Sequence, residues 1–418
     1  MTRPLQKPPK KNPQIRTTAP APPPTPRSRR AHGFSAAAAE GRFVLQHCSA
    51  CGAFIYPARE ACPTCLSMEI VWREAPPGGQ LIAETTIRAS TNTYFRERLP
   101  WRVGSVRMDC GVTIQAHVHG DVAAQARVRL IARTDASGQG VVMALPEQDS
   151  EHMADDRHLR ELTCDPKFRR VLITDGRTEL GQGMAKAMVD AGASIVFVGI
   201  AENWLPFEGR AGLEALAPVQ MVALDVTDTV SVTELAGEIG GKVDILINTA
   251  EHARPGANLD RTGIATSRDE METNYFGLLR LVQAFAPAMK ARGADGDNRA
   301  SAWVNILSVY ALSNGLAFGA ANASHAAALS LAQCLRAELC GSGVKVVNAL
   351  VGPKDEVWRQ LTPPPKVTAG QIATSVTEAL RQGIEDLVVG PVAEDVIKRW
   401  KQDPSALARE MMHSRDEG

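Results

Sequence analysis

Four cysteines in two closely spaced pairs constrain this chain more than any other feature. Cys48 and Cys51 form the first pair, and Cys62 and Cys65 form the second after ten intervening residues. Two residues between cysteines let both sulfurs of a turn point at one ion, and two such turns complete a tetrahedral site. Because no coordination position stays open for water, the pattern predicts a structural zinc site. Metal binding contributes on the order of 10 kcal/mol to folding in such modules.

The residues around the cysteines predict the order of domains. Residues 31–78 predict a short helix and a zinc ribbon, and strand-like runs in 79–150 predict a small antiparallel β-barrel. The polar, acidic stretch 151–166 is interpreted as a linker. In 167–402, apolar runs alternate with helical stretches, which is typical of a parallel sheet covered on both faces. Residues 403–418 are expected to form a tail. The predicted fold class is thus multidomain, with a zinc ribbon and barrel followed by an α/β doubly wound sheet.

The net charge of zero is a sum of unlike parts. The chain has 46 Lys and Arg against 46 Asp and Glu, but residues 1–30 hold eight of the basic residues, nine prolines and no acid. Such a composition predicts a disordered basic tail. It lacks the apolar core of a secretory signal, and its prolines oppose the amphipathic helix of a transit peptide. We therefore expect a reducing, cytoplasmic location. No apolar run reaches the ~18 residues of a membrane span, so no membrane partner is expected.

The first half of the chain resembles the rubredoxin-like zinc ribbon and OB-fold proteins of the DUF35 family. The residues that carry the resemblance are EGRFVLQHCSACG (40–52), YPAR (56–59), LPWRVGSVRMDCG (99–111) and IQAHVHG (114–120). The resemblance implies a structural zinc ion and association with acyl-CoA and with a thiolase or thiolase-like aldolase. OB folds also bind oligonucleotides. Nucleic acid is not expected here, because no basic run with interleaved aromatic residues is present.

The second half resembles the short-chain dehydrogenase/reductase (SDR) superfamily. The segments that carry the resemblance are RRVLITDG (169–176), GQG (181–183), LDVTD (224–228) and DILINTAE (244–251). The resemblance implies a Rossmann-like fold with an NAD(P) site. Its residues here would be Thr174, Gly176, Gly181, Gly183, Asp225 and Asn248. Two departures stand out: Asp175 replaces a glycine with one extra residue before Gly181, and Glu251 replaces another glycine. An acid in this loop opposes a dianion, so the sequence leaves NAD(P) binding open.

The catalytic residues implied by the SDR resemblance are incomplete. The family uses Asn, Ser, Tyr and Lys, and Asn274 and Ser308 fit the first two. A gapless alignment places Ala321 at the Tyr position and His325 at the Lys position. Alanine cannot transfer a proton, and loss of a positioned acid or base costs ~10²–10⁴ in rate. The candidates for substitutes are His325, which titrates near neutral pH, and Tyr310.

Three hypotheses follow from these observations. In the first, the chain is a non-catalytic scaffold of a β-oxidation-like complex. Its ribbon and barrel dock the thiolase or aldolase, and its SDR-like half docks an active hydroxyacyl-CoA dehydrogenase, or a second copy, through helices 275–290 and 320–339. In the second, it is an NAD(P)-dependent oxidoreductase acting on a hydroxyacyl- or ketoacyl-CoA with a site rebuilt from Ser308, His325 and Tyr310. The third, a nucleic-acid-binding protein, rests on the basic tail alone.

Two further groups of residues give weaker expectations. His117 and His119 alternate along a predicted strand, and with no further ligand in sequence they are interpreted as surface polar residues. The cysteines outside the two pairs are predicted to be buried thiols; they are Cys110, Cys164, Cys334 and Cys340.

Overall fold

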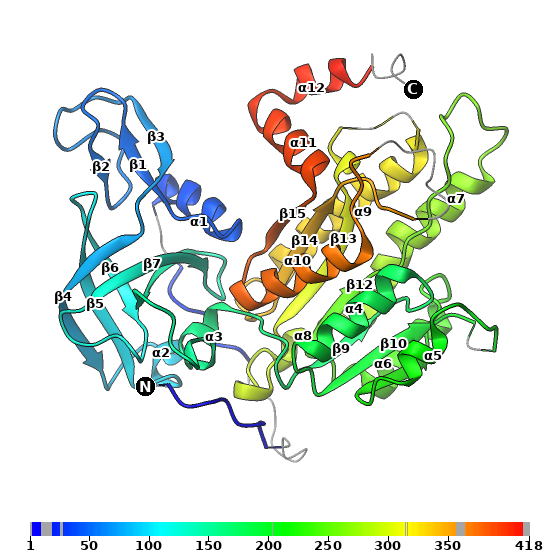
Figure 1. Ribbon diagram of the computed structural model, residues 1–418, viewed down its shortest axis with the longest axis horizontal. Coiled ribbons are helices and arrows are strands. Elements are labelled where there is room, and N and C mark those ends of the chain that lie inside the picture. The colour runs from blue at the N-terminus through cyan, green and yellow to red at the C-terminus, as the bar shows by residue number, and fades with distance from the viewer. Residues whose placement is uncertain are drawn as a thin grey trace.

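The computed structural model describes residues 2–9, 19–25, 28–202, 204–313, 315, 317–356 and 364–412. Its two halves lie side by side, with the ribbon and barrel in one and a large parallel sheet in the other (Figure 1). Within the described residues, no helix is both long and apolar enough to cross a membrane.

The zinc ribbon follows a short helix, α1 (His32–Ala39), as the sequence predicts. Its sheet has the order β2-β1-β3 and is antiparallel. The strands are β1 (Val44–Cys48), β2 (Phe54–Ile55) and β3 (Ile70–Glu74). Phe34 of α1 and Leu45 of β1 are buried in the same cluster as Leu81 and Ile114 of the barrel. The ribbon and the barrel therefore share one hydrophobic core.

The barrel is closed and has five strands in the order β4-β5-β6-β8-β7. The strands are β4 (Gly78–Ile87), β5 (Trp101–Met108), β6 (Thr113–Val118), β7 (Arg127–Thr134) and β8 (Gly140–Pro146), with helix α2 (Thr93–Arg96) before β5. The prediction of a small barrel is confirmed. It is antiparallel except where β6 and β8 pair in parallel, which closes the sheet on itself.

The second half contains a seven-stranded sheet in the order β11-β10-β9-β12-β13-β14-β15, with every pairing parallel. The strands are β9 (Arg170–Ile173), β10 (Ile195–Ile200), β11 (Val219–Ala223), β12 (Ile245–Asn248), β13 (Ala302–Ser308), β14 (Lys345–Val351) and β15 (Asp386–Val389). The sequence predicts the first six. It misses β15, an edge strand in which only Val389 is buried.

Helices cover both faces of this sheet, as predicted. The helices are α4 (Glu179–Asp190), α5 (Arg210–Glu214), α6 (Thr229–Ile239), α7 (Ala265–Met271), α8 (Leu278–Arg292), α9 (Gly319–Leu339), α10 (Ala369–Gln382), α11 (Pro391–Gln402) and α12 (Pro404–Glu410). Side chains of α4, α5 and α10 share one buried cluster with Val171 and Ile173, and those of α6, α8 and α9 share another with Leu172. Neighbouring residues of β9 thus contribute side chains to the cores on opposite faces of the sheet. In Figure 1, α4 and α10 lie on the face towards the viewer.

The segment 151–166 packs between the two halves. It contains the 3-10 turn Met153–Asp155 and helix α3 (Leu159–Leu162), and Leu159 and Leu162 are buried. The Glu161 carboxylate lies 3.0 Å from Arg98 Nε on the barrel side and 2.6 Å from Arg299 Nη1 on the sheet side. The sequence interpretation as a polar linker is therefore incomplete, because two leucines and one carboxylate anchor it.

A second buried contact joins the halves at the β14–β15 edge. The Lys345 ammonium donates to the Thr134 carbonyl at 2.8 Å and lies 3.1 Å from the Glu385 carboxylate. All three residues are buried. The backbone N–H of Glu385 also donates to the carbonyl of Ala39 at 2.8 Å. Because every charge here has a partner, the interface is built like the inside of one domain.

Residues near both ends of the chain, which the sequence predicts to be tails, contact the folded domains. Residues 2–9 and 19–25 have no helix or strand, but the Leu5 N–H donates to Asp155 at 3.0 Å. The prediction of disorder for 1–30 stays a prediction. At the other end, the predicted tail 403–418 begins with α12, and its Leu407 is buried beside α11.

Candidate functional site

The four paired cysteines converge on one point of the ribbon. Their sulfur atoms all lie within 4.8 Å of one another. Cys48 Sγ is 3.6 Å from Cys65 Sγ, and Cys51 Sγ is 3.6 Å from Cys62 Sγ. A tetrahedral zinc ion with bonds of about 2.3 Å places its sulfurs about 3.8 Å apart. The donor set therefore fits one structural zinc ion.

The backbone of the two turns supports thiolate ligands. In each pair the backbone N–H of the second cysteine lowers the pKa of the first, so that Cys51 acts on Cys48 and Cys65 acts on Cys62. Neighbouring thiols and burial raise the pKa of Cys51 and Cys65. Cys48 and Cys62 are also fully buried, whereas their partners are exposed. Zinc binds thiolate rather than thiol, so the backbone prepares the first cysteine of each pair for the metal.

The residues predicted to bind a dinucleotide gather at the carboxyl ends of β9 and β12. Thr174 Oγ1 donates to Asn248 Oδ1 at 2.8 Å and accepts from the N–H of Thr249 at 3.0 Å. The Gly176 N–H donates to the carbonyl of Gly199 at 2.9 Å. The Gly181 N–H donates to the Thr178 hydroxyl at 3.1 Å, which caps α4. These groups hold the loop together through bonds within the protein.

Gly181, Gly183 and Asp225 play local structural roles. Gly181 permits close packing, because a Cβ there would lie 1.8 Å from the Asp175 carbonyl. Gly183 has ordinary space around it, with the nearest atom 3.7 Å from a built Cβ. Asp225 accepts from the backbone N–H of Thr227 at 2.8 Å and forms a turn before α6.

Acidic side chains surround the start of α4, where a dinucleotide phosphate would have to lie. Asp175 pairs with Arg177 at 3.2 Å, and Arg177 lies 3.7 Å from Glu202. Glu179 is in the first turn of α4. A helix N-terminus attracts anions. The two carboxylates oppose a pyrophosphate here, whereas the Arg177 guanidinium between them favours one.

Asn274 lies where the SDR resemblance expects it, in a π-helical segment (Glu272–Gly277) that leads into α8. Its side chain accepts from the N–H of His252 and donates to the carbonyl of His252, both at 2.8 Å. It also donates to the Ser324 hydroxyl at 2.8 Å. Asn274 thus fixes the loop after β12, and with it the neighbouring Glu251.

Glu251 stands at the centre of a buried charged cluster. Its carboxylate pairs with the Lys354 ammonium and lies 3.1 Å from His325 Nε2. The other ring nitrogen of His325 accepts from the Ser308 N–H at 3.4 Å, so Nε2 carries the proton and donates to Glu251. The side chains of Lys354, His325 and Glu251 are 7%, 5% and 13% exposed. Burial of these charges is tolerable because they are paired.

The remaining catalytic candidates line the same small space. Ser308, Tyr310, Ala321 and His325 surround a cavity of about 30 Å³ together with Glu251. This volume suits about one water molecule. The Ser308 hydroxyl accepts from the Tyr310 N–H at 3.2 Å, and burial raises the pKa of Tyr310. A raised pKa is opposite to what a catalytic base needs, and Ala321 offers no proton.

Comparison with known families agrees with this architecture. Residues 35–70 match the rubredoxin-like zinc ribbon domain of ChsH2, and 72–132 match the C-terminal OB-fold domain of ChsH2. Residues 169–358 match the short chain dehydrogenase family. The chain thus combines regions that match a ChsH2-type zinc ribbon and OB fold with a region that matches the short chain dehydrogenase family.

Individual relatives match the second half. An uncharacterized oxidoreductase of Mycobacterium tuberculosis is 31% identical over 195 residues, which cover 44% of this chain and 55% of that protein. A fatty acyl-CoA reductase of Acinetobacter baylyi is 26% identical over 248 residues, 58% of this chain and 78% of that protein. The matched region thus spans only about half the length of the first of these.

A solved structure matches as well. A short chain dehydrogenase of Burkholderia cenocepacia in complex with NADP has a TM-score of 0.52 and 29% sequence identity, covering 59% of this chain and 98% of that one. The second half of the chain thus has the SDR fold over almost the whole length of that enzyme.

The sequence missed several features of the site. The sequence gives no indication that Lys354 belongs to the site, because its partner Glu251 is 103 residues away along the chain. The interpretation of His119 as a surface residue is wrong. His119 is fully buried, and its Nε2 lies 2.9 Å from the Met153 carbonyl. Of the four remaining cysteines, Cys164 is buried as predicted and Cys110 is half-buried. Cys334 and Cys340 are exposed, because they lie on the outer side and at the end of α9.

Proposed function

We propose that this chain is a non-catalytic accessory subunit of an acyl-CoA degradation complex. Its ribbon and barrel dock a thiolase or thiolase-like aldolase, and its SDR-type half docks an active hydroxyacyl-CoA dehydrogenase or a second copy. The observation that carries the proposal is the charged cluster of Glu251, His325 and Lys354 beside Ala321. It fills the space in which an SDR enzyme would perform its chemistry.

The ribbon offers a surface that suits a protein partner. Leu66 is 79% exposed, Met68 is 74% exposed and Val71 is 50% exposed. Exposed apolar side chains close together in sequence are typical of interaction sites. These three side chains support docking of the thiolase or aldolase on the ribbon rather than on the barrel wall.

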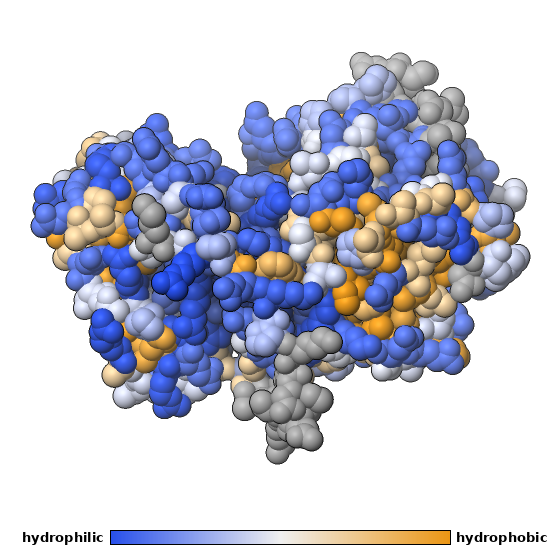
Figure 2. All heavy atoms as spheres, turned by 60° about the horizontal axis from the view of Figure 1, so that its bottom comes forward, coloured by the Kyte–Doolittle hydropathy of each residue, from blue (hydrophilic) through white to orange (hydrophobic). Residues whose placement is uncertain are grey.

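The SDR-type half offers a second apolar surface. On the face shown in Figure 2, hydrophobic residues gather mainly over this half, whereas the ribbon and barrel are mostly hydrophilic. Helices 275–290 and 320–339 are the proposed docking elements for the dehydrogenase. Phe276, at the start of the first, is 42% exposed and lines an apolar groove with Ile264 and Met271.

Copurification from the native source tests the docking proposal. A tagged chain should retain a thiolase-like and an SDR-type protein, and the purified chain alone should not turn over hydroxyacyl- or ketoacyl-CoA with NAD(H) or NADP(H). Leu66→Ser/Met68→Ser should release the thiolase-like protein and keep the SDR-type one. Phe276→Ser should do the reverse. Turnover by the isolated chain would overturn the proposal.

A second candidate is an NAD(P)-dependent oxidoreductase acting on a hydroxyacyl- or ketoacyl-CoA. It is favoured by the convergence of Ser308, Tyr310 and His325 on one cavity, and by the similarity to a fatty acyl-CoA reductase and to an NADP-bound dehydrogenase. In this case Glu251 would have to leave the His325 ring before substrate could enter. Turnover that disappears in Ser308→Ala and His325→Ala would support it, and unchanged turnover would exclude this site.

A further inference from the structure

The first described segment, residues 2–9, crosses from the barrel to the half that contains the parallel sheet. At its start, the Thr2 N–H donates to the carboxylate of Asp121, in the loop between β6 and β7 of the barrel. At its end, the Asn298 side-chain amide, which lies before β13, donates to the Pro9 carbonyl at 3.0 Å. A bond to the segment that connects the halves lies between these two contacts. Residues 2–9 therefore span the joint between the halves.

The second described segment, residues 19–25, lies where the two halves meet. Pro23 is buried, and its carbonyl accepts from the Ser137 hydroxyl at 3.3 Å, in the turn between β7 and β8. On the other side, Pro22 packs against Gly341 at the end of α9, because a Cβ added to this glycine would lie 3.3 Å from Pro22. Gly341 has a φ of +81°, which favours glycine. This segment thus also contacts both halves.

The exposure of the first segment repeats every three residues. Thr2, Leu5 and Pro8 are partly buried, whereas the residues between them are exposed. In the second segment, Pro23 is buried between two exposed prolines. A period of three is typical of the polyproline II helix, which turns once in three residues and forms no internal hydrogen bonds. One edge of each segment therefore faces the protein, and the carbonyls of Pro9 and Pro23 accept bonds from it.

Little space is left beneath the second segment. A cavity of about 20 Å³ remains there, which is room for about one water molecule. Its lining includes Pro20 and Ala21 of the segment, Tyr94 and Arg98 on the barrel side and Gly341 on the sheet side. The Arg98 guanidinium lies 4.0 Å from the centre of the Tyr94 ring. Proline-rich segments in the polyproline II conformation dock on surfaces that contain aromatic side chains.

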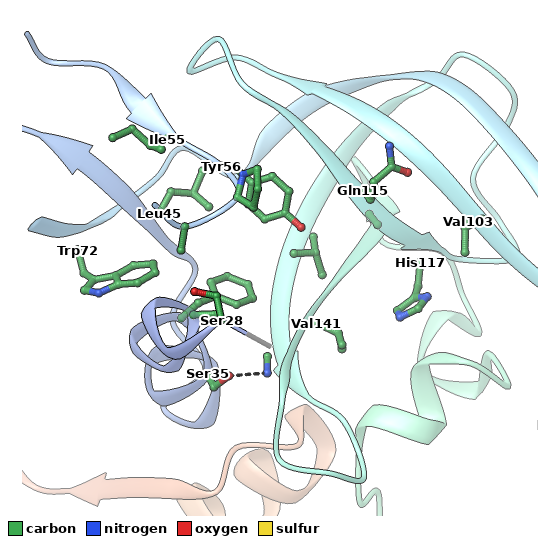
Figure 3. Close-up of a pocket in the computed structure, with 17 residues that line it drawn as sticks. Ser28, Ser35, Leu45, Ile55, Tyr56, Trp72, Val103, Gln115, His117 and Val141 are labelled. Atoms are coloured by element: carbon green, nitrogen blue, oxygen red, sulfur yellow. Dashed lines mark hydrogen bonds between the residues drawn. The ribbon is translucent and has the colours of Figure 1, made fainter. Parts of the chain in front are cut away.

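The chain that follows the second segment is attached to the barrel. Ser28 lines a cavity of about 510 Å³ between α1, the ribbon and the barrel (Figure 3). The Ser35 hydroxyl of α1 accepts from the Gly140 N–H of β8 at 2.8 Å, which is the bond drawn in Figure 3. Helix α1 therefore holds one end of the N-terminal segments close to the joint. A segment tethered in this way meets its docking surface at a high effective concentration.

We propose that the joint between the two halves is a docking surface for a polyproline-type segment. The chain's own residues 2–9 and 19–25 occupy it as a strap that fastens the ribbon and barrel to the SDR-type half. The basic side chains of Arg3 and Lys7 are exposed, so the strap keeps its charges in water while its backbone makes the contacts. The inference concerns the joint and does not rest on the proposed function.

Hydrogen–deuterium exchange of the zinc-loaded full-length chain and of a variant that lacks residues 2–25 tests the strap. The backbone N–H of Gly341 donates to the Ala136 carbonyl at 2.8 Å across the joint. Without the strap its exchange should be about tenfold or more faster, because exchange follows local opening. The N–H of Val347, in the buried strand β14, should exchange at an unchanged rate, which shows that the variant is folded. Unchanged exchange at Gly341 would overturn the proposal.

A synthetic peptide with the sequence of residues 2–25 identifies the occupant. Added to the shortened variant, it should bind and restore slow exchange at Gly341. A peptide with Pro22→Gly, Pro23→Gly and Pro24→Gly should bind about tenfold or more weakly, because glycine loses more conformational freedom on binding. Failure of the native peptide to bind would show that the strap is not the occupant of this surface. Equal Kd values for the two peptides would overturn the polyproline assignment.

Point variants of the full-length chain locate the contacts without removing any residue. Ser137→Ala/Asn298→Ala removes one donor to the strap from each half and should make exchange at Gly341 several-fold faster. Ser330→Ala, at an exposed position of α9, is the control and should not change it. Equal exchange at Gly341 in the double variant and the wild type would contradict the assignment of these two contacts to the strap.

Discussion

The two halves of the molecule differ in the volume and the lining of the cavities at their expected sites. The ribbon and barrel enclose about 510 Å³ behind neutral walls, whereas the SDR-type half reduces its site to about 30 Å³ crossed by a buried ion pair. The expected catalytic site of the SDR-type half is therefore nearly filled, although the same half carries an open surface groove of about 510 Å³ beside Phe276. The largest space in each half thus lies away from the residues that the dehydrogenase resemblance singles out.

The reason for the difference lies in what fills each space. Glu251 replaces a glycine of the family, and its carboxylate recruits Lys354 and His325. Removing either Glu251 or Lys354 would leave the other charge buried without a partner, so the ion pair stabilises the filled site. In the other half, the chamber walls are hydrocarbon and meet without charged groups.

Loss of the zinc site should have the largest effect and should fall on one half. Cys62→Ser removes a ligand from a site worth on the order of 10 kcal/mol in small modules. We expect loss of zinc and proteolysis within 44–75, because the remaining three cysteines no longer hold the strands of the ribbon together. The unfolding transition of the SDR-type half should remain. Zinc analysis and limited proteolysis measure this.

Cys334→Ser is the matched control, because Cys334 is exposed on α9 and outside the zinc site. It should keep one zinc ion per chain. A full zinc content in Cys62→Ser would contradict the ligand assignment.

The bridge between the halves should be sensitive to acid. Burial alone would raise the pKa of Glu161, but Arg299 and Arg98 lower it to about 2. The carboxylate is ionised in the folded state well below its unfolded pKa of about 4.3. Its contribution to stability is therefore complete above about pH 4.3 and is lost as the pH falls towards 2.

Glu161→Gln should lower the free energy of unfolding at pH 7 by about 3–5 kcal/mol, because it leaves two arginines without their carboxylate. It should also flatten the dependence on pH between about 4.3 and 2. Chemical denaturation at several pH values measures both effects. Glu214→Gln, which removes an exposed pair with Arg210, should change stability by less than about 1 kcal/mol. Equal pH profiles for wild type and Glu161→Gln would refute the bridge.

The closed site should show coupling between its charges. Glu251→Ala should cost about 1.5–3 kcal/mol, because Lys354 then stays buried without its carboxylate. Glu251→Ala/Lys354→Met should cost less than the sum of the single changes, since it removes both charges. Denaturation of all three variants measures the coupling. Strict additivity would show that the pair does not hold the site closed, and Glu202→Ala at the exposed edge serves as a control.

Much of this fold could be predicted from the sequence, and the reasons are local. The spacing of Cys48, Cys51, Cys62 and Cys65 defines the zinc site without any tertiary information. The six apolar runs define the parallel sheet because buried strands read as continuous hydrophobic segments. The sequence does not predict the edge strand Asp386–Val389, in which only Val389 is buried, or the buried positions of Leu159 and Leu162 within an otherwise acidic stretch.

The sites were harder to predict because they depend on contacts between distant segments. Glu251 is visible in the sequence as a departure from the family, but the pairing with Lys354 exists only after β12 and β14 lie in one sheet. The cavity is still less visible. Its walls join α1 to β3 and β6, and no single segment shows that hydrocarbon side chains will enclose a space there.

The smallest effect should come from the start of α10, whose other end contacts the barrel through Gln382. Thr368 caps this helix: its hydroxyl accepts from the Gln371 N–H at 3.2 Å, and the Gln371 side chain accepts from the Thr368 N–H at 2.9 Å. Thr368→Ala should cost about 1 kcal/mol. Thr374→Ala, at an exposed position within the same helix, should cost less.

Because α10 belongs to the SDR-type half, Thr368→Ala should lower the unfolding temperature of that half and leave that of the ribbon and barrel unchanged. A parallel loss of stability in the ribbon and barrel would show that the two halves are coupled through the contact of Arg133 with the carbonyl of Gln382. The two halves would then share their stability as well as their interface, and the contrast between the open and the closed site would be a property of one cooperative unit.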